Sequence, residues 1–243
     1  MLDAFNIAAT GMHAQQTNVD VIANNLANVN TAGFKKSRVD FEDMMYHHIK
    51  AAGGLLTTPD IENPIGTGST ISSVTKVFSQ GELLNTQKPY DIAIQGEGFL
   101  ELLLPDGTYA YTRTGALDID ADGMLVNGDG FKLSPLVQVP SDTKNVVIQQ
   151  DGRIMAEFQG DGEFIEIGSI ELIRFMNTAS LTPMGDNLYI PSHASGDAIY
   201  GEPGKDGYGS IAQGFLETSN VELVEELTNL ILAQRSYETV SYT

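Results

Sequence analysis

The sequence predicts an α+β protein that is mainly β: a central antiparallel β barrel or sandwich-like domain, flanked by N- and C-terminal helices that form coiled coils. Apolar residues recur at alternating steps of three and four near both ends of the 243-residue chain, which is the heptad period of a coiled coil. The long stretch between these ends is dense in Asp-Gly and Asn-Gly pairs, the strongest short-range signals for β-hairpins.

The first thirty residues predict one long helix with an apolar seam, interrupted only by Gln15. The seam consists of Phe5, Ala8, Met12, Gln15, Val19, Ile22, Leu26 and Val29. The turn residues Asn30-Thr31-Ala32-Gly33 predict the end of the helix, because glycine readily takes a positive φ. Several polar residues on the far face are poor helix formers, so packing of the seam has to stabilise this helix.

A second seam predicts a helix over residues 219–243. It consists of Leu223, Leu227, Leu230, Gln234 and Tyr237. Ser219 and Glu222 fit the N-cap and N3 positions of a capping box. Because neither seam has an evident partner within one chain, we expect both ends to be mostly disordered in a monomer and to pair between copies.

The middle of the chain predicts an extended intermediate segment over residues 31–74 and an outer β domain over residues 75–218. The clearest hairpin joins residues 99–104 to residues 108–113 through Pro105-Asp106-Gly107. The other predicted strands cover residues 91–95, 146–149, 153–158, 164–167, 170–175 and 187–190. No helical period interrupts them, which favours an antiparallel domain over a βαβ fold.

Charge and composition exclude several classes of function. The formal net charge is −19, with most of the acidic excess in the β region, so a nucleic-acid partner is not expected. No apolar run is long enough to span a membrane, so membrane insertion is not expected either. The chain contains no cysteine, which excludes disulfides and thiolate sites. The N-terminus shows no basic region followed by an apolar core, so we expect no cleavable signal peptide.

One acidic stretch has the oxygen spacing of a calcium-binding loop. It places Asp118, Asp120, Asp122 and Asp129 around Gly123. The last position is Asp rather than the usual bidentate Glu, and the flanks predict strands rather than helices. A hairpin with a solvated acidic turn is therefore favoured, and a calcium-binding β module with oligomerising helices is the alternative. No nucleophile–base constellation and no cofactor motif occurs, so we expect neither an enzyme nor a cofactor.

Both ends also carry longer motifs. The N-terminal motif runs from Asn24-Asn25-Leu26-Ala27-Asn28 to Gly33-Phe34-Lys35, and the C-terminal one combines Glu217-Thr218-Ser219-Asn220-Val221 with Gln234-Arg235-Ser236-Tyr237-Glu238. Between them lie Ile65-Gly66-Thr67-Gly68, Ser79-Gln80-Gly81, Asp91–Phe99 and Tyr111-Thr112-Arg113-Thr114-Gly115. In this order the motifs resemble those of the bacterial flagellar rod and hook protein family over essentially the whole chain.

Within that family the sequence is most similar to distal rod members, on the strength of residues 46–68. The resemblance implies an inner core domain of paired terminal helices, an outer β domain, and a structural subunit that self-assembles into a rigid helical tube transmitting torque from motor to hook. A proximal rod or hook subunit is the alternative. The family's C-terminal helix continues a few turns beyond the position of Thr243.

The implied partners are copies of the chain, adjacent rod and hook proteins, the surrounding basal-body rings and the flagellar type III export apparatus. The implied location is the periplasmic basal body. The implied assembly interface consists of Phe5, Met12, Val19, Ile22, Leu26, Val29, Leu223, Leu227, Leu230 and Tyr237.

Overall fold

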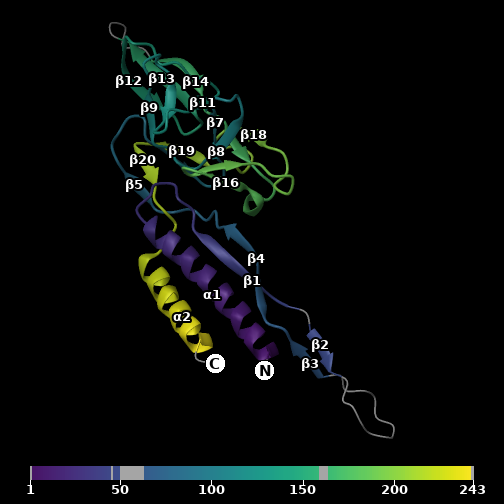
Figure 1. Cartoon of the computed structure of the whole chain (residues 1–243). Coiled ribbons are helices and arrows are strands. Elements are labelled where there is room, and N and C mark those ends of the chain that lie inside the picture. Colours follow the sequence, from purple (N-terminus) through teal and green to yellow (C-terminus); the bar gives the residue numbers. More distant parts are fainter. Residues whose placement is uncertain (1, 45, 50–62, 159–163, 242–243) are drawn as a thin grey trace, which may run out of the picture. The chain divides into compact units, whose positions relative to one another are not determined.

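A computed structural model describes residues 2–44, 46–49, 63–158 and 164–241 (Figure 1). The chain divides into two compact units. The helical unit spans Met1–Ala27, Ser37–Thr75 and Glu222–Thr243, and the β unit spans Asn28–Lys36 and Lys76–Val221. The helical unit is thus assembled from three separate stretches of sequence. Neither described helix combines the length and the apolar character that a membrane crossing requires.

The described residues of the helical unit form two helices and four strands. Helix α1 covers Leu2–Ala27 and α2 covers Leu223–Ser241, and the two helices pack along each other (Figure 1). Strand β1 (Ser37–Asp43) packs on α1 and pairs with β4 (Ser69–Lys76). Strands β2 (Tyr46–Ile49) and β3 (Asn63–Gly66) form an antiparallel pair. Residues 50–62 of the predicted rod-type stretch 46–68 lie outside the described residues.

The two helices pack on each other within one chain, so the expectation that neither has an internal partner is wrong, although most of the second seam stays exposed. On α1 the buried residues are Ala14, Ile22 and Asn25, and on α2 they are Glu226 and Ala233. A Cβ added at Gly11 would lie 3.8 Å from Cγ1 of Val240. Small residues on the facing surfaces therefore let the two helices approach closely.

Both helix boundaries differ from the prediction. Helix α1 ends at Ala27, so Val29 follows the helix instead of extending its seam. Helix α2 begins at Leu223, and the Ser219 hydroxyl accepts the N–H of Val221, which is not a capping-box bond. The capping box fails because the Asn220 side chain ties residues 219–221 to the backbone of the β unit, ahead of the helix.

The β unit contains sixteen described strands, all paired antiparallel where the register is defined. They are β5 Leu83–Asn85, β6 Ile92–Gln95, β7 Leu100–Leu103, β8 Tyr109–Thr112, β9 Leu117–Ile119, β10 Leu125–Asn127, β11 Lys132–Ser134, β12 Thr143–Ile148, β13 Arg153–Phe158, β14 Phe164–Ser169, β15 Leu172–Arg174, β16 Thr182–Gly185, β17 Leu188–Ile190, β18 Ile199–Gly201, β19 Ser210–Gln213 and β20 Phe215–Glu217, with a short 3-10 helix at Thr178–Ser180.

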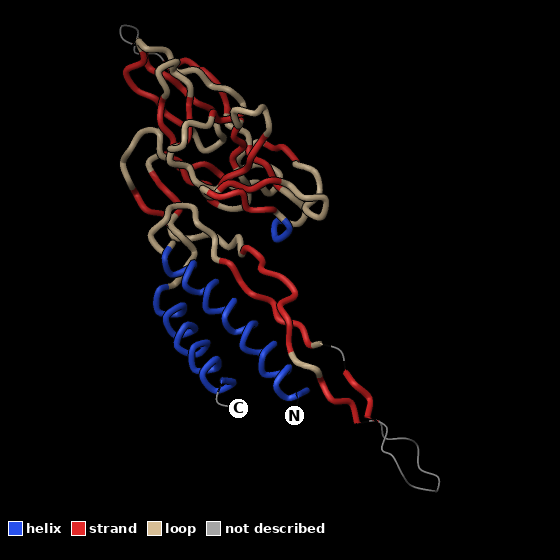
Figure 2. Tube along the Cα trace, viewed as in Figure 1, coloured by secondary structure: helices blue, strands red, loops and turns tan. Residues whose placement is uncertain are grey.

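These strands form several sheets, and the described ones do not close into a barrel, so that part of the prediction is wrong (Figure 2). The largest sheet has the order β16-β17-β8-β7-β11-β10-β9. Strands β12-β13-β14 form a separate sheet, and β19-β6, β15-β18 and β20-β5 form two-stranded pairs. Many strands have only three or four residues, which is too short for the continuous stagger that barrel closure requires.

The predicted hairpin between residues 99–104 and 108–113 is confirmed. Strands β7 and β8 pair with Leu102 opposite Ala110, around the turn at Pro105-Asp106-Gly107. The main core buries aliphatic side chains from the seven-stranded sheet, such as Leu100 and Leu102, and from the β12-β13-β14 sheet, such as Ile154. A second, aromatic core packs Phe78, Phe99, Phe175 and Tyr189 edge to face.

Candidate assembly site

The outer side of α2 carries an apolar stripe that the protomer leaves open. Leu223, Leu227 and Ile231 follow at steps of four, and Val224 lies beside them. Their exposed fractions are 50% for Leu223, 40% for Leu227, 59% for Ile231 and 75% for Val224. We call these four residues the α2 stripe. Contiguous exposed apolar side chains of this size mark an interaction surface.

The predicted interface residues divide into covered and open ones. On α1, Ile22 is buried, Met12, Val19 and Leu26 are half-buried, and Phe5 is 70% exposed. On α2, Leu230 is half-buried, whereas Leu223, Leu227 and Tyr237 are exposed. The heptad correctly indicated apolar faces on both helices. It did not show that Glu226 and Ala233 turn toward α1, while most leucines turn away.

The family-motif residue Asn25 links α1 to β1. Its side-chain amide donates to the Ser37 carbonyl at 2.9 Å, and its carbonyl oxygen accepts the Ser37 N–H at 2.8 Å. The same amide lies 3.5 Å from Oε2 of Glu226 on α2. Asn25 and Glu226 are both buried. One neutral side chain thus satisfies both backbone groups of Ser37 and reaches the second helix.

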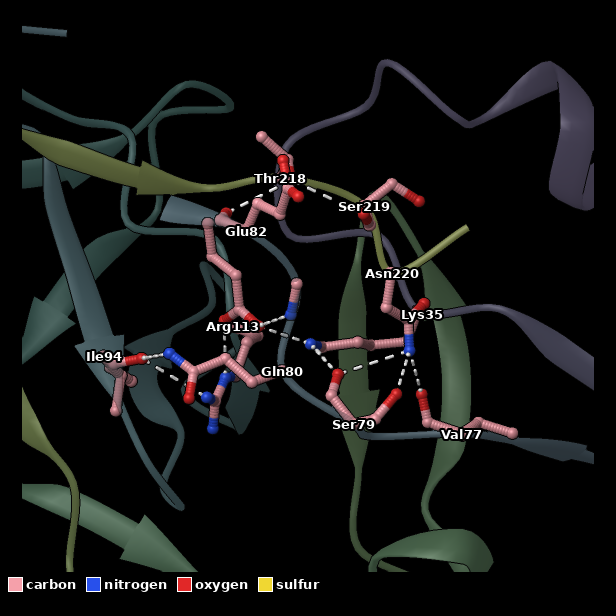
Figure 3. Close-up of polar contacts among 12 residues, drawn as sticks. Lys35, Val77, Ser79, Gln80, Glu82, Ile94, Arg113, Thr218, Ser219 and Asn220 are labelled. Atoms are coloured by element: carbon pink, nitrogen blue, oxygen red, sulfur yellow. Dashed lines mark hydrogen bonds and ion pairs between the residues drawn. The ribbon is translucent and has the colours of Figure 1, made fainter. Parts of the chain in front are cut away.

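In the β unit, a buried carboxylate joins three distant segments. Glu217, at the end of β20, accepts the ammonium of Lys35 at 2.6 Å through Oε1 and the Nε of Arg113 at 2.8 Å through Oε2. Oε1 also accepts the backbone N–H of Gly81 at 2.8 Å. Lys35 is completely shielded from solvent. Figure 3 labels Lys35 and Arg113 within the network of polar contacts at this place.

Both cations also donate to backbone carbonyls. Lys35 donates to the Ser79 carbonyl at 2.7 Å. Arg113 donates to the carbonyls of Gly98 at 2.7 Å, Gly96 at 2.5 Å and Ile94 at 3.4 Å. Buried charges are tolerated when they are paired and hydrogen-bonded, and each charge of this cluster has an ionic partner and further hydrogen bonds.

Asn220 provides a second tie at the same place. Its carbonyl oxygen accepts the N–H of Lys36 at 2.8 Å, and its amide donates to the Val77 carbonyl at 2.8 Å and the Ser79 hydroxyl at 2.9 Å (Figure 3). We call Lys35, Arg113, Glu217 and Asn220 the Glu217 junction.

Two glycines are required for the junction to close. A Cβ at Gly81 would lie 2.1 Å from the Thr218 carbonyl oxygen, and one at Gly33, which has φ +71°, would lie 2.3 Å from Oγ1 of Thr114. The N–H of Gly33 donates to the Glu217 carbonyl at 2.8 Å. The glycines of both motifs therefore permit close backbone approach. Phe34, another motif residue, is buried with the Lys76 ammonium 4.4 Å above its ring.

At the junction, burial and ion pairing shift the pKa values of the charged groups in opposite directions. Burial alone would raise the pKa of Glu217, but Arg113 and Lys35 outweigh it and hold that pKa below its usual value. Burial lowers the pKa of Lys35, and the attraction of Glu217 only partly offsets this effect. Near neutral pH we therefore treat Glu217 as ionised, which holds the two cations in place.

The other motif residues occupy separate places. Asn24 and Ala27 are exposed on α1, Asn28 is half-buried after it, and Val221 is buried just before α2. Gln234, Arg235 and Glu238 are exposed on α2, where Arg235 pairs with Glu238 at 3.0 Å. Gln16, Val19, Gln234, Tyr237 and Glu238 line a shallow groove of the helical unit.

The acidic stretch forms two hairpins, as favoured. Strands β9 and β10 pair with Leu125 opposite Ile119, so Asp118 lies in a strand while Asp120 and Asp122 lie in the turn. Asp129 lies in the next turn, where its carboxylate accepts the amide of Asn127. In the part of the chain that the structure describes, no three acidic or histidine side chains gather in a way that could hold a metal ion.

Sequence reasoning found the motifs but missed the junction. In the sequence, Glu217, Lys35 and Arg113 stand out only as members of three separate motifs. A usable signal existed: a lone Arg between buried strands and a lone Lys after a positive-φ glycine both need an acidic partner. Which acid they meet depends on tertiary pairing over 182 and 104 residues of sequence.

Three family models match this chain. "Flagella basal body rod protein" matches residues 5–35, "Flagellar hook protein FlgE/F/G D1 domain" matches residues 93–156, and "Flagellar basal body rod FlgEFG protein C-terminal" matches residues 212–242. The first match contains Asn25 and Lys35, the second Arg113, and the third Glu217 and Asn220. Each model therefore contributes residues to the Glu217 junction.

The chain is also similar to whole proteins. It is 44% identical to the flagellar basal-body rod protein FlgG of Borreliella burgdorferi, over 98% of this chain and 92% of the relative. It is 38% identical to FlgG of Bacillus subtilis, over 99% and 93%. The hook protein FlgE of B. burgdorferi is 39% identical over only 52% of this chain and 29% of that protein.

Proposed function

The chain belongs to the flagellar basal-body rod protein family and is a structural subunit rather than an enzyme, and on that premise we propose that it builds the distal rod. In this proposal, copies assemble through their terminal helices into a rigid helical tube that transmits torque from the motor to the hook. The open α2 stripe is the observation that carries the proposal, because a protomer that leaves four large apolar residues uncovered is built to meet a partner.

Packing supplies the mechanism. The α2 stripe and Phe5 meet a different surface on the neighbouring copy, since one protomer already pairs its own α1 with its own α2. A head-to-tail contact of this kind generates an open helical array. Burying one Leu or Ile contributes about 1.5–3 kcal/mol, so a few such residues per contact, repeated along the tube, suffice for stable assembly. Coiled-coil packing between copies forms part of this proposal.

The family resemblance completes the proposed setting. Copies of the chain, adjacent rod and hook proteins, the basal-body rings and the flagellar type III export apparatus are the proposed partners. The periplasmic basal body is the proposed location. Residues 46–68 are proposed to brace neighbouring subunits, with β2 and β3 as the described part of that stretch.

A single charge on the stripe tests the proposal. Leu227→Asp places a carboxylate where assembly would bury it, and we expect electron micrographs of the purified chain to show no tubes. The matched control is Ser236→Asp, which adds the same charge to an exposed polar position of α2. Tubes of normal length from Leu227→Asp would overturn the stripe as the interface, provided that circular dichroism shows a folded β unit in both variants.

The hook alternative is weaker, because the hook relative aligns with only about half of this chain. A complementation experiment distinguishes the proposed distal rod subunit from a proximal one. We expect the chain to restore rods in a strain lacking its distal rod subunit, and not in one lacking a proximal subunit. The reverse pattern would favour the proximal assignment.

A further inference from the structure

The two segments that lead to the terminal helices are held at one place in the β unit. Residues 28–36 directly follow α1, and residues 218–221 are separated by one residue from the start of α2 at Leu223. The N–H of Gly33 donates to the Glu217 carbonyl at 2.8 Å, and the N–H of Lys36 donates to Asn220 at 2.8 Å. The Lys35–Glu217 ion pair lies between these two backbone ties.

The central β unit fastens both segments from a third side. Arg113 reaches Glu217 from the end of β8, and the Ser79–Gly81 stretch supplies a carbonyl for Lys35 and an N–H for Glu217. Glu217 thus contacts both terminal segments and the folded β unit at once. Removing its charge leaves two buried cations without their anion, which disfavours the closed junction.

We infer that Glu217 is a positioning residue for the terminal helix pair: by closing the junction, it makes the chain leave the β unit toward α1 and α2 from neighbouring points. The pairing of α1 with α2 then becomes a local event with a high effective concentration. With the junction open, residues 28–36 and 218–221 add to the tether between the helices. Lengthening a flexible tether about threefold lowers the effective concentration about fivefold. This inference goes beyond the rod assignment, because it concerns the protomer before any assembly.

The helix pair offers a direct reporter. A Cβ at Gly11 would lie 3.8 Å from Cγ1 of Val240, so the side chains of Gly11→Cys and Val240→Cys lie within reach of each other and can report helix pairing by forming a disulfide. The natural chain contains no cysteine, so these two thiols report helix pairing without interference. The rate of intramolecular disulfide formation is measured by thiol trapping on dilute protomers of the full chain.

Glu217→Gln in this double-cysteine background is the main variant, because Gln keeps the shape of the side chain and removes its charge. We expect the disulfide to form about fivefold more slowly, while circular dichroism still shows a folded β unit. Glu82→Gln, at an exposed carboxylate of the neighbouring segment, is the control and should leave the rate unchanged. An unchanged rate in Glu217→Gln with a folded β unit would overturn the inference.

Asn220→Ala decides the matter if Glu217→Gln prevents folding of the β unit. It removes the second tie without leaving a buried charge. Slower disulfide formation in Asn220→Ala supports the inference, and the unsubstituted rate overturns it. Because the assay uses dilute protomers, its result is independent of tube formation: Leu227→Asp tests the rod proposal, and it should not change the rate of this disulfide.

Discussion

The β unit and the helical unit bury their apolar residues to very different extents. In the β unit, Leu100, Leu102 and Ile154 have no exposed surface. In the helical unit, the buried apolar residues of the helices are Ala14, Ile22 and Ala233, while Val224 and Ile231 stay open. The β unit thus buries its core within one chain, whereas the helical unit leaves large apolar side chains open, as the proposed interface requires. If that proposal holds, folding of the β unit and assembly through the helical unit can be tested separately.

The two units also differ in the polar group that fixes their irregular segments. The helical unit uses the neutral Asn25 amide on Ser37, and the β unit uses the ionised Glu217 between Lys35 and Arg113. Both groups are buried, so each has to be fully satisfied. Only the second one changes its charge with pH.

The largest effect is expected from a cavity in the β unit. Leu102→Ala removes a fully buried side chain of β7, and large-to-small changes of this kind cost about 2–5 kcal/mol of the free energy of unfolding. Chemical denaturation followed by circular dichroism measures the loss. Leu136→Ala, at a side chain that is mostly exposed, should cost less than about 0.5 kcal/mol. Equal losses would contradict a complete core in this unit.

A smaller, local effect is expected from the Asn25 amide. Asn25→Ala removes the side-chain partner of both backbone groups of Ser37, which are partly buried, and at about 0.5–1.5 kcal/mol per hydrogen bond the loss is about 1–3 kcal/mol in all. Hydrogen exchange should show faster exchange of the Ser37 amide and of the last turn of α1, with the β unit unchanged. Asn6→Ala, at an exposed position of α1, serves as the control. Unchanged Ser37 protection in Asn25→Ala would show that the amide does not fix this segment.

The pH dependence of the free energy of unfolding should distinguish the Glu217 junction from the neutral Asn25 link. The pKa of Glu217 is lowered from its ordinary value of 4.5. The unfolded chain therefore takes up this proton first, and the stabilisation is complete above pH 4.5 and is lost as the pH falls through the lower folded pKa. We expect the stability difference between the unsubstituted protein and Glu217→Gln to narrow below pH 4.5. A constant difference between pH 7 and pH 3 would assign that difference to packing instead of charge.

The smallest effect on protomer stability is expected on the α2 stripe. Ile231→Ser changes a side chain that is mostly exposed in the protomer, so the free energy of unfolding should change by less than about 0.5 kcal/mol. The same variant should raise the protein concentration needed for tube formation, because assembly loses about 1.5–3 kcal/mol of burial per contact. Sedimentation at graded concentrations measures this. A destabilised protomer with normal assembly would reverse the comparison between the two units.

Much of the β unit could be predicted from local sequence. Turn pairs such as Asp106-Gly107 fix where strands end, and residues 153–158 form β13 as predicted. Whether the strands close into a barrel could not be predicted in the same way, because closure depends on which strands pair over long sequence separations. The placement of β17 beside β8 is such a pairing.

The candidate sites were predicted less evenly. The heptad identified both helices, since an apolar period is a property of each helix alone. It could not identify the face that each helix turns to the other, because Glu226 and Ala233 do not look like contact residues. Nor could it identify Glu217 as the partner of Lys35 and Arg113, because strand pairing between β20 and β5 brings that carboxylate into place.

Strands β5 and β20 are antiparallel neighbours, with Leu84 opposite Leu216. The polypeptide therefore departs into the β unit and returns from it along a single two-stranded stem. Insertions or deletions distal to this stem leave its register intact, as lengthening a hairpin leaves its base unchanged. Most of this unit can therefore be lengthened or shortened, in evolution or by design, while the stem of β5 and β20 keeps its register.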